Sequence, residues 1–382
     1  MRSFVRLFVL GGAAVLAFGS VGSTDSAAAE AVEIVVPEGV LPPEIPEDNP
    51  VTEAKVALGR KLYFDTRIST DGTVSCSTCH DPRHGFADGR GDKTSKGVSG
   101  QLGTRNSPTV LNAAFLSDQF WDGRADTLEE QAKQPIANPV EHGFKDQAAV
   151  AAKLQELKAD YESLFAAAFG SNEITVERFA QAVASFERTI VSLDAPIDRF
   201  IAGDKKAISE SAQRGWELYN GKARCNTCHG HVGAFPLFTD EDYHNLGVGT
   251  EKIDFEDVAR KGASTVTSGK DIDTLVLTNV QASELGRFII TKEPKHIGAF
   301  KTPQLRNIAL TAPYMHDGSE PTLEKVMDLY NRGGNPNPYL DGGMRPLNLT
   351  PQEITDVVEL MKTFTSSDLK RFDDLQKEMA GR

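Results

Sequence analysis

Two short stretches, Cys76-Ser77-Thr78-Cys79-His80 and Cys225-Asn226-Thr227-Cys228-His229, contain all 4 cysteines of this chain. In each stretch two residues separate the cysteines, and a histidine follows the second one directly. This is the attachment pattern of a c-type haem. Two thiols one helical turn apart can add across the two vinyl groups of one porphyrin, and the adjacent histidine can ligate its iron. The sequence therefore predicts two covalently bound c-type haems, with His80 and His229 as iron ligands.

The cysteines also allow simpler interpretations. The two pairs could together form a four-thiolate zinc site, or each pair could form a redox-active or a structural disulfide. None of these sites requires a histidine directly after the second cysteine, and here both pairs have one. The pattern therefore favours haem over zinc or a disulfide.

Residues 1–29 have the features of a cleavable secretory signal peptide. Arg2 and Arg6 precede an apolar stretch at residues 7–18, and small residues continue to position 29. An apolar stretch of about a dozen residues is too short to span a bilayer, and no later segment approaches the roughly twenty residues that a span needs. We therefore expect a soluble, exported protein of the periplasm, without a membrane span in the mature chain.

Length and charge restrict the remaining possibilities. The chain has 382 residues and a net charge of −13, with a pI near 5.2. This length suffices for two ordinary domains. An acidic protein lacks the basic surface that nucleic-acid phosphates require, so we expect no nucleic-acid partner. An acidic surface could instead attract a basic protein partner.

A diverged internal repeat divides the chain into two halves. Residues 59–63 precede the first haem motif and residues 215–219 precede the second, and both have the form G-x-x-L-Y at the end of a helical pattern. We therefore predict a mainly α fold with two cytochrome c-like domains, each with one covalently attached haem. The predicted domains are residues 51–203 and 204–365.

Two amphipathic helices are expected near the ends of these domains. Residues 175–191 place Phe179, Val183, Phe186 and Ile190 at spacings of three and four. Residues 350–353 supply an N-cap threonine, a proline at the first helical position and a glutamate at N3. Residues 230–299, in contrast, have no sustained periodicity, and we expect a long loop region around the second haem.

Several further stretches resemble the di-haem bacterial cytochrome c peroxidases and the related MauG proteins. They are RNSPT at 105–109, QFWDGRA at 119–125, NPVE at 138–141 and LRNIALTAPYMHDG at 305–318. The resemblance extends from about residue 51 to 365 and keeps the same order around both haem motifs. It implies that the half with His80 reacts with peroxide and that the half with His229 relays electrons.

The resemblance implies that Gln131, Pro135 and Glu141 form the distal side of the first haem. Glu141 would be the acid and base, because peroxide must lose a proton from one oxygen and gain one on the other as the bond breaks. Without its motif, Glu141 would be interpreted as a solvated or helix-capping carboxylate. Trp121 would lie between the haems and pass electrons, a role that is compatible with packing in a core.

The resemblance also concerns the sixth ligands of the two irons. Many of the better-known peroxidases block the first haem with a histidine from the following loop, but here that loop contains only His84, which we expect near the surface. The first iron would therefore be open. At the second haem a methionine of the peroxidases is matched by Tyr330, as in MauG proteins, and a phenolate favours oxidised iron. Met327 and Met315 remain alternative ligands.

A calcium ion between the domains is a further implication of the resemblance. Its ligands would be the side chain of Asn106 and the backbone carbonyl groups of Thr311 and Pro313. Oxygen donors of this kind, completed by water, suit a hard cation.

The function implied is that of a periplasmic di-haem peroxidase that uses hydrogen peroxide, with electrons from cytochrome c or another small redox donor. An alternative is a MauG-like enzyme that oxidatively modifies residues of a protein substrate. Tyr330 and residues 243–247 favour this alternative, but Ala223 stands near the place of a tryptophan that MauG uses for contact. A non-enzymatic di-haem electron carrier is less compatible with the few histidines and methionines of the first half.

Overall fold

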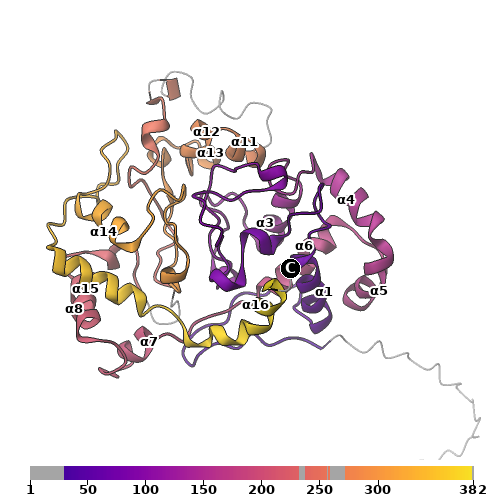
Figure 1. Ribbon diagram of the computed structural model, residues 1–382, viewed down its shortest axis with the longest axis horizontal. Coiled ribbons are helices and arrows are strands. Elements are labelled where there is room, and N and C mark those ends of the chain that lie inside the picture. The colour runs from indigo at the N-terminus through magenta and orange to yellow at the C-terminus, as the bar shows by residue number, and fades with distance from the viewer. Residues whose placement is uncertain (1–29, 232–236, 256, 259–271, 381–382) are drawn as a thin grey trace, which may run out of the picture.

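The computed structural model describes residues 30–231, 237–255, 257–258 and 272–380, and the chain within these ranges is mainly helical (Figure 1). The predicted signal peptide, residues 1–29, lies outside the described residues. The first half of the chain and the second half lie side by side, and the C-terminal residues cross from the second half back to the first (Figure 1).

The helices of the first half are α1 (Glu53–Phe64), α2 (Cys76–Cys79), η1 (Pro82–His84), η2 (Val98–Gly100), η3 (Ala113–Phe115), α3 (Leu128–Ile136), α4 (Gln147–Glu156), α5 (Lys158–Phe169) and α6 (Val176–Glu187). The elements that follow are α7 (Pro196–Ile201), α8 (Glu210–Asn220), η4 (Cys225–Thr227), β1 (Tyr243–His244), η5 (Thr250–Lys252), α11 (Ile272–Thr278), α12 (Val280–Glu284), α13 (Phe288–Thr291), η6 (Pro294–His296), β2 (Phe300–Lys301), η7 (Ile308–Leu310), α14 (Leu323–Asn331), α15 (Pro351–Lys362), η8 (Ser367–Phe372) and α16 (Asp373–Ala380).

The two helices expected from their periodicity and capping residues are present as α6 and α15. Thr175 caps α6 by accepting a hydrogen bond from a backbone N–H of its first turn, and the apolar stripe of this helix is buried. Thr350 and Glu353 form the capping box of α15, with Pro351 at its first position. Local sequence signals therefore define where both helices begin.

Each G-x-x-L-Y repeat lies where two helices cross closely. α1 packs against α6 in the first half, and α8 packs against α15 in the second half. A Cβ atom at Gly59 would collide with the backbone carbonyl of Ala182 in α6, and one at Gly215 would collide with the carbonyl of Asp356 in α15. The repeat therefore begins with glycine because a larger residue would force each pair of helices apart.

The repeat continues beyond the segments that the sequence revealed. Over residues 112–135 the corresponding residues of the two halves keep a constant offset in number. The positive-φ pairs Asn112/Asn307, Phe120/Met315 and Gly123/Gly318 and the helix N-caps Thr127/Thr322 share this offset. By this correspondence α3 and α14 are equivalent helices, and Pro135 and Tyr330 occupy equivalent positions in them.

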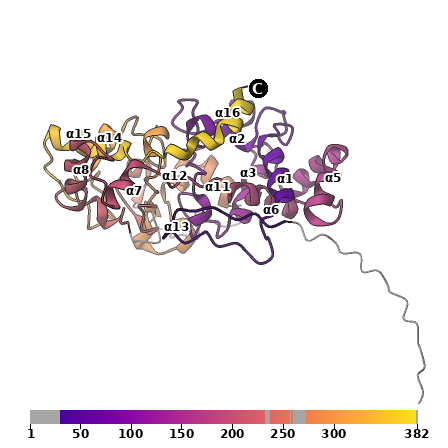
Figure 2. The same ribbon diagram turned by 90° about the horizontal axis from the view of Figure 1, so that it is seen from below.

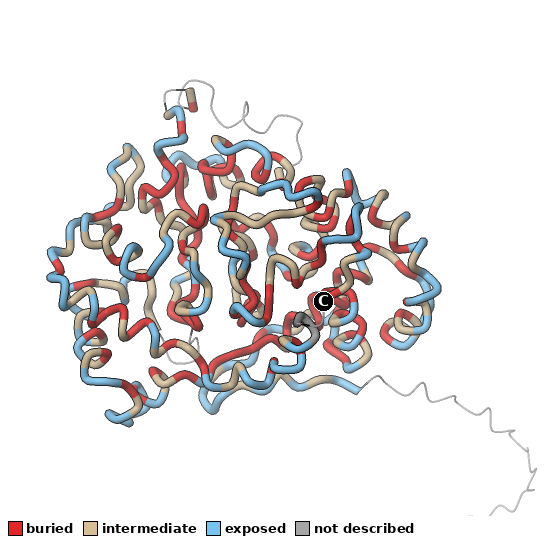
Figure 3. The backbone as a smooth tube through the Cα atoms, viewed as in Figure 1, coloured by how far each residue is buried: buried red, intermediate tan, exposed pale blue. Residues whose placement is uncertain are grey.

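Separate hydrophobic clusters fill the interior of the two halves (Figure 3). Residues 58–190 contribute most of the first cluster, between α1, α3, α4, α5 and α6. Side chains of α8, α14 and α15 contribute to the clusters of the second half. The division into domains at residues 203 and 204 stays a prediction.

The expectation of a long loop at residues 230–299 was wrong for part of that range. α11, α12 and α13 lie within it, and β1 pairs with β2 antiparallel, so that Tyr243 lies opposite Lys301. Helices of one or two turns are too short to establish a 3.6-residue period, and β1 depends on a partner far along the chain. This explains why the pattern of residues did not reveal them.

The C-terminal residues return to the first half (Figures 1 and 2). Phe372 and Leu375 are buried in the hydrophobic cluster of the first half, and α16 contacts η1. These residues lie outside both predicted domains, because the second of them ends at residue 365. Within the described ranges, the helices are too short or too polar to cross a bilayer.

We expect Gly59→Ala to lower the free energy of unfolding by at least about 1 kcal/mol, because overpacking a tight contact typically costs about 1–3 kcal/mol. Chemical denaturation measures this change. Gly342→Ala is the matched control, since a Cβ atom at exposed Gly342 meets nothing within 4 Å. Equal stability of the two variants would contradict the role given to the helix crossing.

Candidate functional site

The first cysteine pair begins and ends the single-turn helix α2, and His80 follows it directly. Nδ1 of His80 lies 3.0 Å from the backbone oxygen of Pro108 and 3.3 Å from that of Phe86. Because a carbonyl can only accept, Nδ1 carries the proton and Nε2 is left as a metal ligand. Burial lowers the pKa of His80, which favours the neutral imidazole that binds metals.

The second motif has the same geometry. Nδ1 of His229 donates to the backbone oxygen of Phe238 at 2.9 Å, and burial lowers the pKa of His229 as well. The hydroxyl groups of Tyr63 and Tyr219, which end the two G-x-x-L-Y repeats, donate to the backbone carbonyls of His80 and His229 respectively. The repeat therefore fixes the histidine backbone in both halves.

A largely apolar cavity adjoins the second motif. Cys225, Cys228 and His229 line one part of it, and Tyr330 of α14 lines another. An apolar cavity with two thiols and one neutral imidazole fits a porphyrin that is attached by thioether bonds and ligated by histidine. The residues of the first motif offer the same set of donors, although covalent attachment itself stays a prediction.

The structure does not support the zinc and disulfide interpretations. All four cysteines are free, and the two pairs belong to different halves, so they do not form a four-thiolate site. Burial raises the pKa of the Cys79 and Cys225 thiols to about 12. A redox-active thiol needs the opposite shift.

Glu141 lies in the segment that follows α3, close to the first cysteine pair. Its carboxyl group is near enough to raise the pKa of both Cys76 and Cys79. Burial, with the charge of Asp273 acting in the same direction, raises the pKa of Glu141 to about 8, while Arg124 opposes this shift. At neutral pH the group is therefore mostly protonated, and it can exchange a proton without a large change in free energy.

A buried network of charges holds the surroundings of Glu141. Arg124 pairs with Asp122 at 3.1 Å and with Asp273 at 2.6 Å. Asn138, in the same NPVE segment as Glu141, donates to the other oxygen of Asp273 at 2.7 Å. Asp273 comes from α11, far along the chain, and no local signal in the sequence pointed to it.

Gln131 and Pro135 lie one turn apart on α3. Both are half-buried, and their contribution to a distal pocket stays a prediction. Pro135 occupies the position equivalent to Tyr330, and a proline side chain has no atom that can ligate a metal.

Three candidate ligands line the cavity of the second motif. They are Tyr330, Met327 and Met315. Met327 is 1% exposed and belongs to a hydrophobic cluster, whereas Tyr330 is half-buried. Burial raises the pKa of Tyr330, so the phenolate that would bind iron forms only with the help of a nearby cation.

The predicted calcium ligands lie together between the halves. Asn106, Thr311 and Pro313 line one small cavity, and Trp121 lines both this cavity and the one beside the second motif. Nε1 of Trp121 donates to the backbone oxygen of Asn106 at 2.9 Å. The side-chain NH2 group of Asn106 donates to the backbone oxygen of Lys93 at 3.1 Å. This orientation leaves Oδ1 of Asn106 as the atom that could bind a cation.

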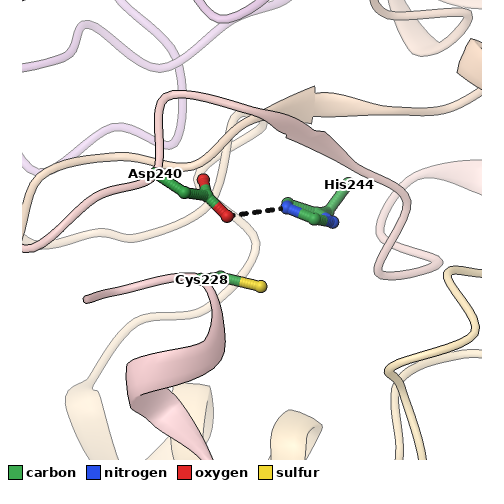
Figure 4. Close-up of side chains that lie close together, drawn as sticks. All are labelled: Cys228, Asp240 and His244. Atoms are coloured by element: carbon green, nitrogen blue, oxygen red, sulfur yellow. Dashed lines mark hydrogen bonds and ion pairs between the residues drawn. The ribbon is translucent and has the colours of Figure 1, made fainter.

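Residues 243–247 hold a histidine between two carboxylates beside the second motif. Nε2 of His244 pairs with Asp240 at 3.1 Å, and Cys228 lies next to this pair (Figure 4). Nδ1 of His244 pairs with Asp341 at 2.7 Å. Asp240, with contributions from Cys228 and Asp341, raises the pKa of His244 to about 11. The raised pKa favours the protonated form of His244, which is a cation and not a metal ligand, beside the second motif.

A second buried group was also missed in the sequence. Nε2 of His316 lies 2.7 Å from Glu284, and the Lys252 ammonium lies 2.9 Å from Glu284 and 3.1 Å from Asp317. The ammonium group of Lys252 therefore supplies a positive charge beside the carboxylates of Glu284 and Asp317.

Two residues considered in the sequence lie outside these groups. His84 is exposed and lies 3.5 Å from Asp81. Trp216 packs against Tyr219 in the core.

Glu187 is a further buried carboxyl group near the first motif. It is 5% exposed, and its Oε2 atom has no hydrogen-bond partner among the described residues. Burial raises its pKa to about 8, and Arg188 only partly opposes this shift. After burial, the charge of Glu187 helps to raise the pKa of Tyr63 and of Cys76, so Glu187 lies close to α2.

Known proteins share both the sequence and the fold of this chain. A family model described as di-haem cytochrome c peroxidase matches residues 53–206. Cytochrome-c peroxidase IdrP1 of Denitromonas iodatirespirans is 36% identical over 363 residues, or 94% of each chain. Methylamine utilization protein MauG of Methylorubrum extorquens is 38% identical over 321 residues, which cover 83% of this chain and 80% of MauG. The crystal structure of a MauG-like protein associated with microbial copper homeostasis matches with a TM-score of 0.70 at 33% identity, covering 89% of this chain and 97% of that one.

We expect Glu187→Gln to flatten the pH dependence of stability. The native state keeps the Glu187 proton up to a pKa of about 8, whereas an ordinary glutamate loses it near 4.5, so stability falls as the pH rises between these values. The variant should lose about 4 kcal/mol less across this range, because one pKa unit corresponds to about 1.4 kcal/mol, measured by denaturation at pH 5 and pH 8.5. Glu177→Gln, at an exposed position of the same helix, is the control. Parallel curves for all three proteins would refute the buried, protonated state.

Proposed function

The chain belongs to the di-haem cytochrome c peroxidase family of oxidoreductases, and from this we propose that it is a periplasmic enzyme that uses hydrogen peroxide as its oxidant. In this proposal cytochrome c or another small redox donor supplies the electrons. Cys76, Cys79 and His80 hold one c-type haem, and Cys225, Cys228 and His229 hold the other. Tyr330 is the second protein ligand of the latter.

One observation carries the proposal, namely the asymmetry of the two halves. The half with Glu141 has Pro135 at the position where the other half has Tyr330. An acid with a pKa of about 8 therefore accompanies the half without a protein ligand at that position. Such a pairing suits a half that reacts with peroxide, while two protein ligands suit a half that transfers electrons.

The residues of the chain supply the proton transfers of this reaction. When bound, the first haem would supply the iron that binds peroxide and accepts its oxidising equivalents. Glu141, in its ionised form, would take a proton from one oxygen of peroxide and return it to the other oxygen, which leaves as water. Arg124 and Asp273 hold the charges around Glu141 in place, so that little reorganisation is needed.

We also propose Trp121 as an electron relay between the two haems. It lines the cavity of the second motif and the small cavity between the halves, and its indole N–H is held by the backbone of Asn106. We also assign a calcium ion to Asn106, Thr311 and Pro313, which share that small cavity. The ion would tie the second half to the first through backbone and amide oxygens.

A MauG-like reaction on a protein substrate is the second candidate. The phenol of Tyr330 in the second cavity favours it, because a phenolate stabilises oxidised iron. Ala223 weakens this candidate. It is 5% exposed and belongs to a hydrophobic cluster, so it offers no aromatic contact to a substrate.

Peroxide titration of the fully oxidised protein tests the proposal. We expect two porphyrin equivalents in the mass of the purified chain and a prompt change in the absorbance and EPR spectra of one high-spin haem. A protein with no added porphyrin mass, or with two low-spin haems that ignore peroxide, would refute the assignment.

We expect Glu141→Gln to slow the reaction with peroxide by about 100-fold or more, because an amide cannot exchange a proton as a carboxyl group does. Stopped-flow absorbance measures this rate, and the haem content should not change. Glu130→Gln, at an exposed position of α3, is the control and should react like the native protein. A native rate in Glu141→Gln would exclude this residue as the acid and base.

We expect Tyr330→Met to raise the reduction potential of the second haem, because a thioether favours reduced iron whereas a phenolate favours oxidised iron. Potentiometric titration measures the potential of each haem. Met327→Leu is the control, since it keeps an apolar side chain in the same cavity. If Met327→Leu changes the ligand spectrum and Tyr330→Met does not, Met327 is the ligand.

A further inference from the structure

Two phenylalanines hold the carbonyl groups that face the haem histidines. The backbone oxygens of Phe86 and Phe238 lie 3.3 Å and 2.9 Å from Nδ1 of His80 and His229. Both phenylalanines have φ of 57°, and both side chains are fully buried. The proximal loop of each half therefore contains the same unusual residue at the same place.

A left-handed backbone is unfavourable for a bulky residue such as phenylalanine. Such a conformation persists only where the surrounding structure holds it. The aromatic rings must therefore be fixed by packing if the two carbonyl groups are to keep facing the histidines.

One segment of chain packs on both rings. Phe364, just after α15, stacks on Phe238 with ring centroids 4.6 Å apart. Phe372, at the end of η8, meets Phe86 edge-on with centroids 5.2 Å apart and an interplanar angle of 80°. Residues 364–372 therefore contact the proximal loops of both halves, and this short segment crosses between them (Figure 1).

The crossing segment is anchored where the two halves are joined. The backbone N–H of Ser367 donates to the carbonyl of Asp194 at 2.8 Å, and Oγ of Ser192 donates to Asp368 at 2.9 Å. Asp194 and Ser192 lie in the connection between α6 and α7. Phe372 is thus held at a defined distance from the second half, and its place on Phe86 does not depend on α16 alone.

We propose that Phe372 is a positioning residue for His80, which acts by holding Phe86 in the backbone conformation that directs its carbonyl group to Nδ1. The proposal rests on the proposed function, in which His80 ligates the iron of the first haem. The carbonyl of Pro108 also accepts from Nδ1 at 3.0 Å. Loss of the Phe86 contact therefore weakens the orientation of the imidazole without removing it.

The test compares three variants of the full-length, haem-loaded protein. Resonance Raman spectra of the reduced protein give the iron–histidine stretching frequency, which falls when the hydrogen bond to Nδ1 weakens. We expect Phe372→Ala to lower this frequency for the high-spin first haem and to slow its reaction with peroxide about 10-fold, the effect typical of losing an outer-shell partner. The low-spin second haem should keep its EPR signal.

Phe372→Leu and Leu375→Ala distinguish positioning from general loosening. Leucine refills part of the space, so Phe372→Leu should give a smaller shift in the same direction. Leu375 is 6% exposed in the same hydrophobic cluster, but its side chain has no aromatic ring to pack edge-on against Phe86 as Phe372 does. Leu375→Ala should therefore leave the iron–histidine frequency at its native value. If Phe372→Ala does not fold, the comparison of Phe372→Leu with Leu375→Ala still distinguishes positioning of His80 from general loosening of the core.

An unchanged frequency in the Phe372 variants, or an equal shift in Leu375→Ala, overturns the proposal. The proposed function fails in a different way. In that case the native protein lacks covalent haem, or its haems ignore peroxide although the frequency shift in Phe372→Ala is present.

Discussion

The hydrogen bond from a histidine Nδ1 to a backbone carbonyl is the contact on which the rest of this structure depends. It fixes the tautomer of His80 and His229 and leaves the other ring nitrogen of each for a metal. The tyrosines at the ends of the two repeats hold the histidine backbone from the other side. Each of these tyrosines lies in the same helix as the glycine of its repeat, which allows the close helix crossing. The packing of each half therefore helps to fix the histidine and its free ring nitrogen.

The two halves use this common frame for different chemistry. Where the second half has Tyr330 on α14, the first half has Pro135 on α3. One change of side chain on equivalent helices therefore removes a possible metal ligand from the first half, whose next segment carries Glu141. The buried network of Arg124 and Asp273 is added only around the acid.

The sequence predicted those parts of the site whose residues are close together in the chain. The haem motifs, the G-x-x-L-Y repeats and the capping box of α15 are local, and the fold agrees with each of them. Asp273 could not be predicted, because its role depends on a contact with Arg124 across a large sequence separation. Glu187 looked like an ordinary helical glutamate until its surroundings were known, since burial is a property of the fold.

The return of the C-terminal residues to the first half has a consequence for how the molecule is assembled. Phe372 and Leu375 complete the interior of a half whose other residues were synthesised first. That half therefore cannot reach its final packing before residues 372 and 375 are in place. Until then Phe86, whose backbone carbonyl faces His80, lacks the aromatic ring that packs on it.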